Sequence, residues 1–284
     1  MKGVSIIICC HNSAKRIVKT LQHILLLRNE GIQWEIILVD NLSTDNTIEI
    51  AKSVWETQNN SKDLKIVTEP QLGLKFAREK GIKTARFDYL IFVDDDNWLN
   101  GNYLIQVYRM FEESEKISLI GGLGEPVSDS PLPTWFNRFQ NLFAVGRPVV
   151  KSGILQKGSG YVYGAGMCLR KSAYLELESL GFYSLSADRR GKHLSGGHDV
   201  ELSYALRLID HQVVFDESLV FSHYVDQNRA TFLYLKRLCA GSAANTVPFI
   251  YYLFLYKKVK SDWKFILFYI KRIFGDLIDL FSLF

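Results

Sequence analysis

The chain has 284 residues, of which 48% are apolar, and a formal net charge of +4. This composition excludes disordered and fibrous proteins, and the length allows one large domain or two small ones with a sizeable core. The four cysteines show no metal-ligand spacing, and adjacent Cys9 and Cys10 cannot easily pair, which favours a reducing cytosol over a secreted, disulfide-linked protein.

The charge is unevenly distributed along the chain. Residues 228–284 hold nine basic and three acidic side chains, a net charge of +6 that leaves −2 for the rest, and 14 of the 37 aromatic residues. Such a change in composition indicates two parts with different surroundings. We predict a domain over residues 1–240 and a basic, aromatic helical extension over residues 241–284.

Short apolar runs alternate with helical patterns through the first half. Strands are predicted over Val4–Cys10, Glu35–Asp40, Leu64–Thr68 and Tyr89–Asp94. Helices are predicted over Ala14–Arg28, Asn46–Gln58, Leu74–Arg86 and Asn100–Glu113, with a later one from about His198 to Ile209. This alternation implies right-handed crossovers and an α/β fold whose mainly parallel sheet has helices on both faces.

Polar residues cluster where three of these strands end. The first strand runs into His11, the second ends at Asp40, and the fourth ends in the triplet Asp94-Asp95-Asp96. Parallel sheets bind ligands beyond the carboxyl ends of their strands. The sequence therefore predicts a ligand site along one edge of the sheet.

The aspartate triplet carries the strongest local signal. Three consecutive carboxylates repel one another unless a cation or a hydrogen-bonding ligand compensates them. A divalent ion held by one or two carboxylates and by substrate phosphates fits this pattern. A solvated acidic turn that caps the next helix is the alternative.

Other candidates are weaker when taken singly. Asp40 could accept hydrogen bonds from a ribose or a base, or lie in an ordinary turn. Arg78 could reach a phosphate, or lie on a solvated helix face. Asp199 follows a glycine loop at a predicted helix start, which suits a general base or an ordinary helix-terminal carboxylate, and neighbouring His198 could assist it or only cap the helix. His223 is structural or a further metal or diphosphate contact.

The order of these motifs resembles that of the family 2 glycosyltransferases, which are inverting enzymes of the GT-A fold. The resemblance runs over about residues 3–240. It rests on five motifs: His11-Asn12, Asp40-Asn41 followed by Ser43, Asp45 and Thr47, Gly73 with Ala77-Arg78 and Gly81, Phe92-Val93-Asp94-Asp95-Asp96, and Gly197-His198-Asp199 with Arg207. The segment from His223 to Thr231 is similar to one in bacterial polysaccharide members.

The resemblance implies a role for each matching residue. Asp40 would contact the nucleobase, Asp94 and Asp95 would lie near the ribose, Arg78 would support the nucleotide, and Cys9 and His11 would adjoin it at the end of the first strand. Asp96, with His223, would hold Mg²⁺ or Mn²⁺ against the donor diphosphate, and Asp199 would be the general base. The chain departs from common family patterns at Cys10-His11, Arg78-Glu79 and His198-Asp199.

These implications predict a metal-dependent transferase that moves a sugar from a nucleotide sugar, with uridine as the expected base, to a glycan or lipid-linked precursor. A sugar-1-phosphate nucleotidyltransferase is an alternative, but residues 11–16 form no glycine-rich triphosphate loop. A membrane-anchored nucleotide-sugar-binding scaffold without catalytic activity is another.

The basic extension predicts contact with a membrane surface. Residues 247–256 carry no charge but are too few to span a bilayer. Residues 263–284 fit an amphipathic helix with a broad apolar face, which could lie among lipid headgroups. A helix pair docked on the catalytic domain or in a dimer interface is the alternative. We expect a peripheral protein on the cytoplasmic face of the cell membrane, and no nucleic-acid binding, because the sheet region is net acidic.

Overall fold

A computed structural model describes residues 2–57, 64–186, 194–243 and 245–256, together with Leu267 and Ile270. Its strands are β1 (Val4–Cys10), β2 (Trp34–Asp40), β3 (Leu64–Thr68), β4 (Tyr89–Asp94), β5 (Asn97–Leu99), β6 (Ile117–Val127), β7 (Gly153–Ile154), β8 (Cys168–Arg170) and β9 (Gln212–Tyr224). Its helices are α1 (Ile17–Leu25), α2 (Thr47–Thr57), α3 (Leu74–Thr84), α4 (Tyr103–Glu113), α5 (Phe136–Phe139), the 3-10 turn η1 (Gln140–Phe143), α6 (Lys171–Ser179), α7 (His198–Leu208), α8 (Phe232–Ala243) and α9 (Thr246–Tyr256).

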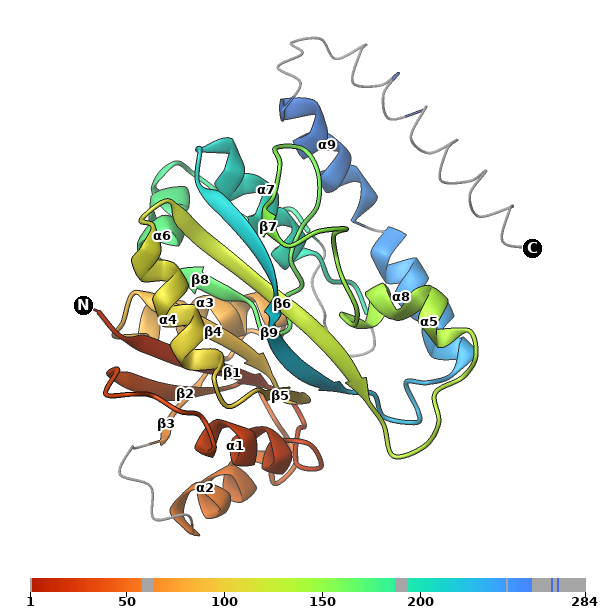
Figure 1. The fold of residues 1–284 in the computed structure, drawn as a ribbon. Coiled ribbons are helices and arrows are strands. Elements are labelled where there is room, and N and C mark those ends of the chain that lie inside the picture. The colour runs from red at the N-terminus through yellow and green to blue at the C-terminus, as the bar shows by residue number, and fades with distance from the viewer. Residues whose placement is uncertain are drawn as a thin grey trace.

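The strands form one mixed sheet in the order β3-β2-β1-β4-β8-β6-β9-β5, with β7 paired to β9 (Figure 1). The first four strands run parallel, as does the pair β6 and β9, whereas β8, β5 and β7 run antiparallel to their neighbours. The predicted mixed, mainly parallel α/β sheet is confirmed.

Alternate side chains of β1 enter two separate cores, because successive residues of a strand point to opposite faces. Ile6 and Ile8 pack with the apolar faces of α1, α2 and α4. Ile7 packs on the other face with residues of α3, α6 and α7. The sheet is therefore covered by helices on both faces.

The chain order fixes where the sheet leaves room for a ligand. Strand β1 lies between β2 and β4, so the crossovers that follow it lead to opposite sides. The register places Cys10 beside Asp40 and Cys9 beside Asp94. The carboxyl ends of three parallel strands are thus level at one topological switch point, as the sequence predicted.

Helices α8 and α9 continue the packing past residue 240. Leu235 and Leu238 of α8 join a small core with Phe136 and Phe143. Tyr252 of α9 is buried in the core beneath α7. Residues 241–243 and 245–256 therefore contact the sheet domain, whereas the predicted amphipathic helix over residues 263–284 lies outside the described residues except for Leu267 and Ile270.

A buried carboxylate holds α9 and a loop against α7. Glu201 is fully buried and accepts hydrogen bonds from Ser184 Oγ at 2.5 Å and from the backbone nitrogens of Leu185 and Ser186 at 2.9 and 3.1 Å. It also accepts from Ser186 Oγ at 2.9 Å and from the Tyr252 hydroxyl at 3.2 Å. Because each carboxylate oxygen accepts a backbone N–H, an amide nitrogen fits in neither oxygen position, and the site requires an acceptor-only side chain.

We expect Glu201→Gln to lower the free energy of unfolding by about 3 kcal/mol, since an amide nitrogen would face donors and the charge-assisted bonds would be lost. Tyr252→Phe removes only one of these bonds and is the matched control, with a loss of about 1 kcal/mol. Urea denaturation monitored by circular dichroism measures both variants. Equal stability of Glu201→Gln and the wild type would contradict this account of the clamp.

Candidate functional site

A cavity of about 650 Å³ opens at the switch point. The ends of β1 and β4, the start of α3, the segment 161–165, the start of α7 and the helices α8 and α9 contribute to its walls. The residues predicted for the site that line it are Cys9, His11, Arg78, Asp94, Asp95, Asp96, Asp199 and His223. Most of the predicted site thus comes together in one place.

The aspartate triplet forms the turn between β4 and β5. Arg16 Nη2 lies 2.6 Å from Asp95 Oδ2, and Ser13 donates a hydrogen bond to the same oxygen. Thr20 Oγ1 binds the Asp95 backbone oxygen at 2.8 Å. Burial and the adjacent Asp96 nevertheless raise the pKa of the Asp95 carboxyl above its usual range. Asp95 is therefore held in place by the segment that leads into α1.

Asp96 is buried, with 6% of its surface exposed. Its Oδ2 pairs with Arg229 Nη1, and its Oδ1 lies 3.4 Å from His223 Nε2. Burial alone would raise the pKa of Asp96, but His223 and Arg229 hold it well below its usual range. This carboxylate therefore stays ionised at neutral pH.

Arg78 lies beneath the first aspartate of the triplet. Its Nη2 is 3.7 Å from Asp94 Oδ1 and donates to the Gly164 backbone oxygen at 3.2 Å. The Arg78 side chain is only 5% exposed, so the alternative of a solvated helix face is wrong. A Cβ atom on Gly164 would lie 2.5 Å from Arg78 Nη2, which explains why a glycine occupies this position.

Asp199 lies in the first turn of α7, where the helix dipole favours a negative charge. Its Oδ2 accepts a hydrogen bond from the Gly164 backbone nitrogen at 2.6 Å. The Gly164 residue therefore links Arg78, through its oxygen, to Asp199, through its nitrogen. Asp199 faces the same cavity as the aspartate triplet.

Asp40 is not among the residues that line the cavity. Its Oδ1 accepts a hydrogen bond from the Ser43 backbone nitrogen at 3.1 Å. Asn41 lines the cavity instead, and its side chain binds the backbones of Glu69, Gln71 and Gly73 at 3.0, 2.8 and 2.7 Å. The role implied for Asp40 stays a prediction.

Asp96 and His223, the two residues predicted to hold a metal, lie next to each other. Neither ring nitrogen of His223 has a hydrogen-bond partner in the described part of the chain, and the ring is buried against Asp96. A carboxylate oxygen and an unsatisfied imidazole nitrogen fit a divalent cation. Among the described residues no group of three or more His, Cys, Asp or Glu side chains could hold a metal, so such an ion would need further ligands from a bound substrate.

Two features of the cavity were missed in the sequence, and so was the role that Arg207 plays outside it. Arg16 and Arg229 pair with the triplet, but an isolated arginine gives no signal of a partner 79 or 133 positions away. Phe249, Ile250 and Leu253 of α9 form an apolar part of the wall, which the sequence instead assigned to an extension. Arg207, which belongs to the resembling motif, is buried and donates to the backbone oxygens of residues 156, 159 and 160, so it shapes a loop.

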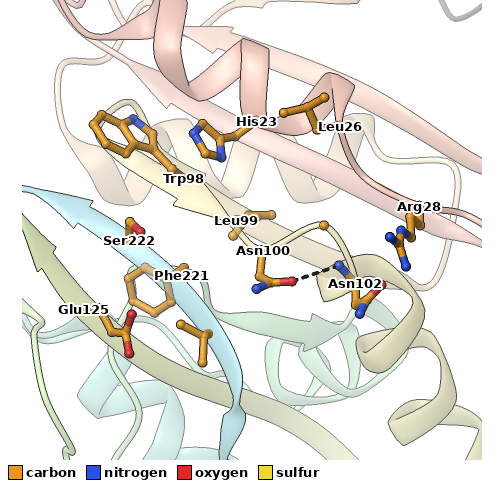
Figure 2. A pocket seen from close by; sticks show the side chains of 12 residues that line it. His23, Leu26, Arg28, Trp98, Leu99, Asn100, Asn102, Glu125, Phe221 and Ser222 are labelled. Carbon is orange, nitrogen blue, oxygen red and sulfur yellow. Dashed lines mark hydrogen bonds between the residues drawn. The ribbon is translucent and has the colours of Figure 1, made fainter.

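A second pocket of about 490 Å³ lies between the end of α1, β5 and β9. Figure 2 shows His23 and Trp98 side by side in this pocket, and their rings stack with centroids 5.5 Å apart. None of the predicted site residues lines it. The candidate site is therefore the cavity at the switch point.

Comparisons with known proteins agree with this fold. Glycosyltransferase GlyG of Streptococcus pneumoniae serotype 4 (strain ATCC BAA-334 / TIGR4) is 31% identical over 118 residues, which are 42% of this chain and 38% of GlyG. The chain therefore spans less than half of this relative's length.

Two solved structures share the fold at low sequence identity. A fragment of S. aureus TarS in complex with UDP-GlcNAc is 17% identical with a TM-score of 0.56, covering 79% of this chain and 58% of that one. Mannosyltransferase PcManGT from Pyrobaculum calidifontis, in complex with GDP-Man and Mn2+, is 16% identical with a TM-score of 0.56, covering 78% and 56%.

These likenesses show that the fold is GT-A, as predicted. The model of the family described as glycosyl transferase family 2 matches residues 5–176, which is more than half of the chain and includes the aspartate triplet. The chain therefore belongs to glycosyl transferase family 2 and is a glycosyltransferase.

Proposed function

We propose that this glycosyltransferase is metal-dependent and inverting, and that it moves a sugar from a nucleotide sugar to a hydroxyl of a glycan or lipid-linked precursor. One observation carries the proposal: Asp96 and Asp199, more than 100 positions apart, line the same cavity at the switch point. A donor diphosphate at the triplet and an acceptor hydroxyl at Asp199 would then meet in one enclosed space.

Asp199 acts as the general base in this proposal. Its Oδ2 is held by the Gly164 nitrogen, which leaves Oδ1 to accept the proton of the acceptor hydroxyl. The acceptor oxygen attacks the anomeric carbon as the bond from that carbon to the diphosphate oxygen breaks on the opposite side. A single displacement of this kind inverts the configuration of the transferred sugar.

Asp96 and His223 would hold the divalent cation. When bound, such an ion supplies positive charge to the departing nucleoside diphosphate. Arg229 and Arg16 add fixed positive charge on the same side of the cavity, and Arg78 supports the turn from below. The Mn2+ in the PcManGT complex supports this choice of ion.

The donor base is proposed to be uridine. The UDP-GlcNAc complex of TarS supports it, whereas PcManGT binds GDP-Man on the same fold. Thermal-shift measurements with UDP-sugars and GDP-sugars, each with and without Mn²⁺, therefore decide the base, because only a bound ligand raises the melting temperature.

We also propose that the protein acts at the cytoplasmic face of a membrane. Helices α8 and α9 expose large apolar side chains, including Phe232 at 55%, Leu233 at 64% and Tyr251 at 43%. Among the described helices none is long and apolar enough to cross a membrane alone; α8 together with residues 248–256 forms one bent pair that passes by length and composition. Apolar helices beside the lysines at positions 257, 258 and 260 suit peripheral attachment to anionic lipid.

We expect Asp199→Asn to lower kcat by about 10³-fold while leaving donor affinity unchanged, because the amide oxygen can still accept from Gly164 but cannot take a proton. Glu115→Gln, on the exposed loop before β6, is the matched control and should transfer sugar like the wild type. Initial rates over a range of donor and acceptor concentrations separate kcat from KM. Turnover of Asp199→Asn at the wild-type rate would remove this residue from the base role.

Asp96→Asn should weaken Mn²⁺ binding by about 10-fold or more, since the ligand charge at the proposed metal pair is lost. Isothermal titration with Mn²⁺ in the presence of a nucleoside diphosphate measures the affinity without turnover. His223→Asn should show a loss in the same direction, and Glu115→Gln none. If Asp96→Asn binds Mn²⁺ as tightly as the wild type, the metal lies elsewhere.

Deletion of residues 257–284 should abolish flotation with anionic liposomes, because it removes the predicted amphipathic helix and its lysines but keeps α9 and its contacts to α7. The full chain should float with these vesicles, and less with neutral ones. The measurement is the fraction of protein that rises with the lipid in a density gradient. Equal recovery of both forms in the soluble fraction would refute membrane attachment.

A further inference from the structure

A histidine beside the proposed base has no hydrogen-bond partner among the residues that the structure describes. His198 is the first residue of α7, lines the cavity and is only 5% exposed. Neither its Nδ1 nor its Nε2 makes a hydrogen bond within the part of the chain that the structure describes. Buried polar atoms are nearly always paired, so an imidazole left open at a cavity wall points to a ligand.

The imidazole is neutral at physiological pH. Burial, together with the nearby positive charges of Arg78 and Lys75, lowers the pKa of His198 to about 3. A neutral ring presents one N–H donor and one bare nitrogen acceptor. Its ligand must therefore offer both an acceptor and a donor.

The need for both a donor and an acceptor excludes some of the chemical groups that could enter the cavity. A diphosphate offers only acceptors near neutral pH and would leave the bare nitrogen unsatisfied. A metal ion would bind the bare nitrogen, but Arg78 and Lys75 repel a cation here, and no cluster of three metal-binding side chains exists among the described residues. Sugar hydroxyls are both donors and acceptors, so a sugar satisfies both nitrogens.

We propose that His198 is a specificity-determining residue that hydrogen-bonds the hydroxyls of the sugar lying beside Asp199. The inference rests on the proposed function and assigns the side chain that recognises the sugar rather than the nucleotide. Two sugars could supply the hydroxyls, the one carried by the donor and the one that accepts it. Their chemistry is the same, and binding measurements distinguish them.

The test compares His198→Phe, which removes both nitrogens, with His198→Gln, which keeps one amide donor and one carbonyl acceptor. For a donor-sugar contact, His198→Phe should bind the nucleotide sugar about 10-fold more weakly and the corresponding nucleoside diphosphate as tightly as the wild type. For an acceptor-sugar contact, both affinities should stay unchanged and the acceptor KM should rise about 10-fold. His198→Gln should recover part of either loss.

Thermal melting without ligand supplies an independent readout. A buried imidazole without partners is replaced by an apolar ring of similar size, so His198→Phe should melt at the wild-type temperature or about 2–4 °C above it. A histidine that served only the fold would give a lower melting temperature. His211→Gln, beyond the other end of α7, is the matched control and should leave sugar affinity unchanged.

The inference is overturned if His198→Phe binds the nucleotide sugar and uses the acceptor like the wild type, whatever its melting temperature. It is also overturned if nucleoside diphosphate binding falls as much as nucleotide-sugar binding, or if a variant that melts lower is not rescued by glutamine. Failure of the proposed function has a different signature, because the wild type itself would then neither bind a nucleotide sugar nor transfer one.

Discussion

Three consecutive carboxylates on one turn repel one another, and the catalytic half of the molecule is organised around their compensation. Each has its own arginine from a different part of the chain: Arg78 for Asp94, Arg16 for Asp95 and Arg229 for Asp96. Removing a single partner of a buried pair leaves an uncompensated charge, which is far more costly than the pair itself. The turn therefore ties α3, the segment before α1 and the segment before α8 to the end of β4.

The three arginine–aspartate pairs change the role that a metal ion would have at the triplet. The sequence predicted that a cation or ligand must offset the triplet, and the protein supplies a guanidinium to each carboxylate. A divalent ion at Asp96 would share that carboxylate with Arg229 and with His223, whose Nε2 lies 3.4 Å from Asp96 Oδ1 and whose Nδ1 makes no hydrogen bond to a described residue. The arginines therefore compensate the three carboxylates without the proposed ion, which would add further positive charge. A substrate phosphate would complete the ligands of that ion.

Local patterns predicted the first half well, because buried parallel strands have clear apolar runs. Strands β1, β3 and β4 begin and end where predicted. The first helix was predicted from Ala14 but begins at Ile17, since Ser13 and Arg16 turn instead toward Asp95. The long strands β6 and β9 were not predicted, because glycines at 121, 122 and 124 and the polar stretch Asp216-Glu217-Ser218 obscure their alternation.

Site residues were predictable from the sequence where they directly follow a strand. Contacts between residues far apart in the sequence were not. Asp94, Asp95 and Asp96 were found because parallel strand ends meet at one edge. Asp199 was singled out through the family resemblance, since its position alone equally suits an ordinary helix-terminal carboxylate. The contact of Arg229 with Asp96 depends on β9 returning beside β5, which no local pattern encodes. The nucleobase role of Asp40 came from the family resemblance and stays a prediction, whereas its neighbour Asn41 lines the cavity.

Neighbouring residues in the first turn of α7 differ in their hydrogen-bond partners and in their proposed roles. Asp199 is fixed by the Gly164 nitrogen, Glu201 accepts hydrogen bonds from a loop and from Tyr252, and His198 makes no hydrogen bond to any described residue. Since Tyr252 belongs to α9, the helix that carries the proposed base is held by a helix of the extension predicted over residues 241–284. The proposed membrane contact through that extension would therefore act on a helix that hydrogen-bonds Glu201, two residues after the proposed base.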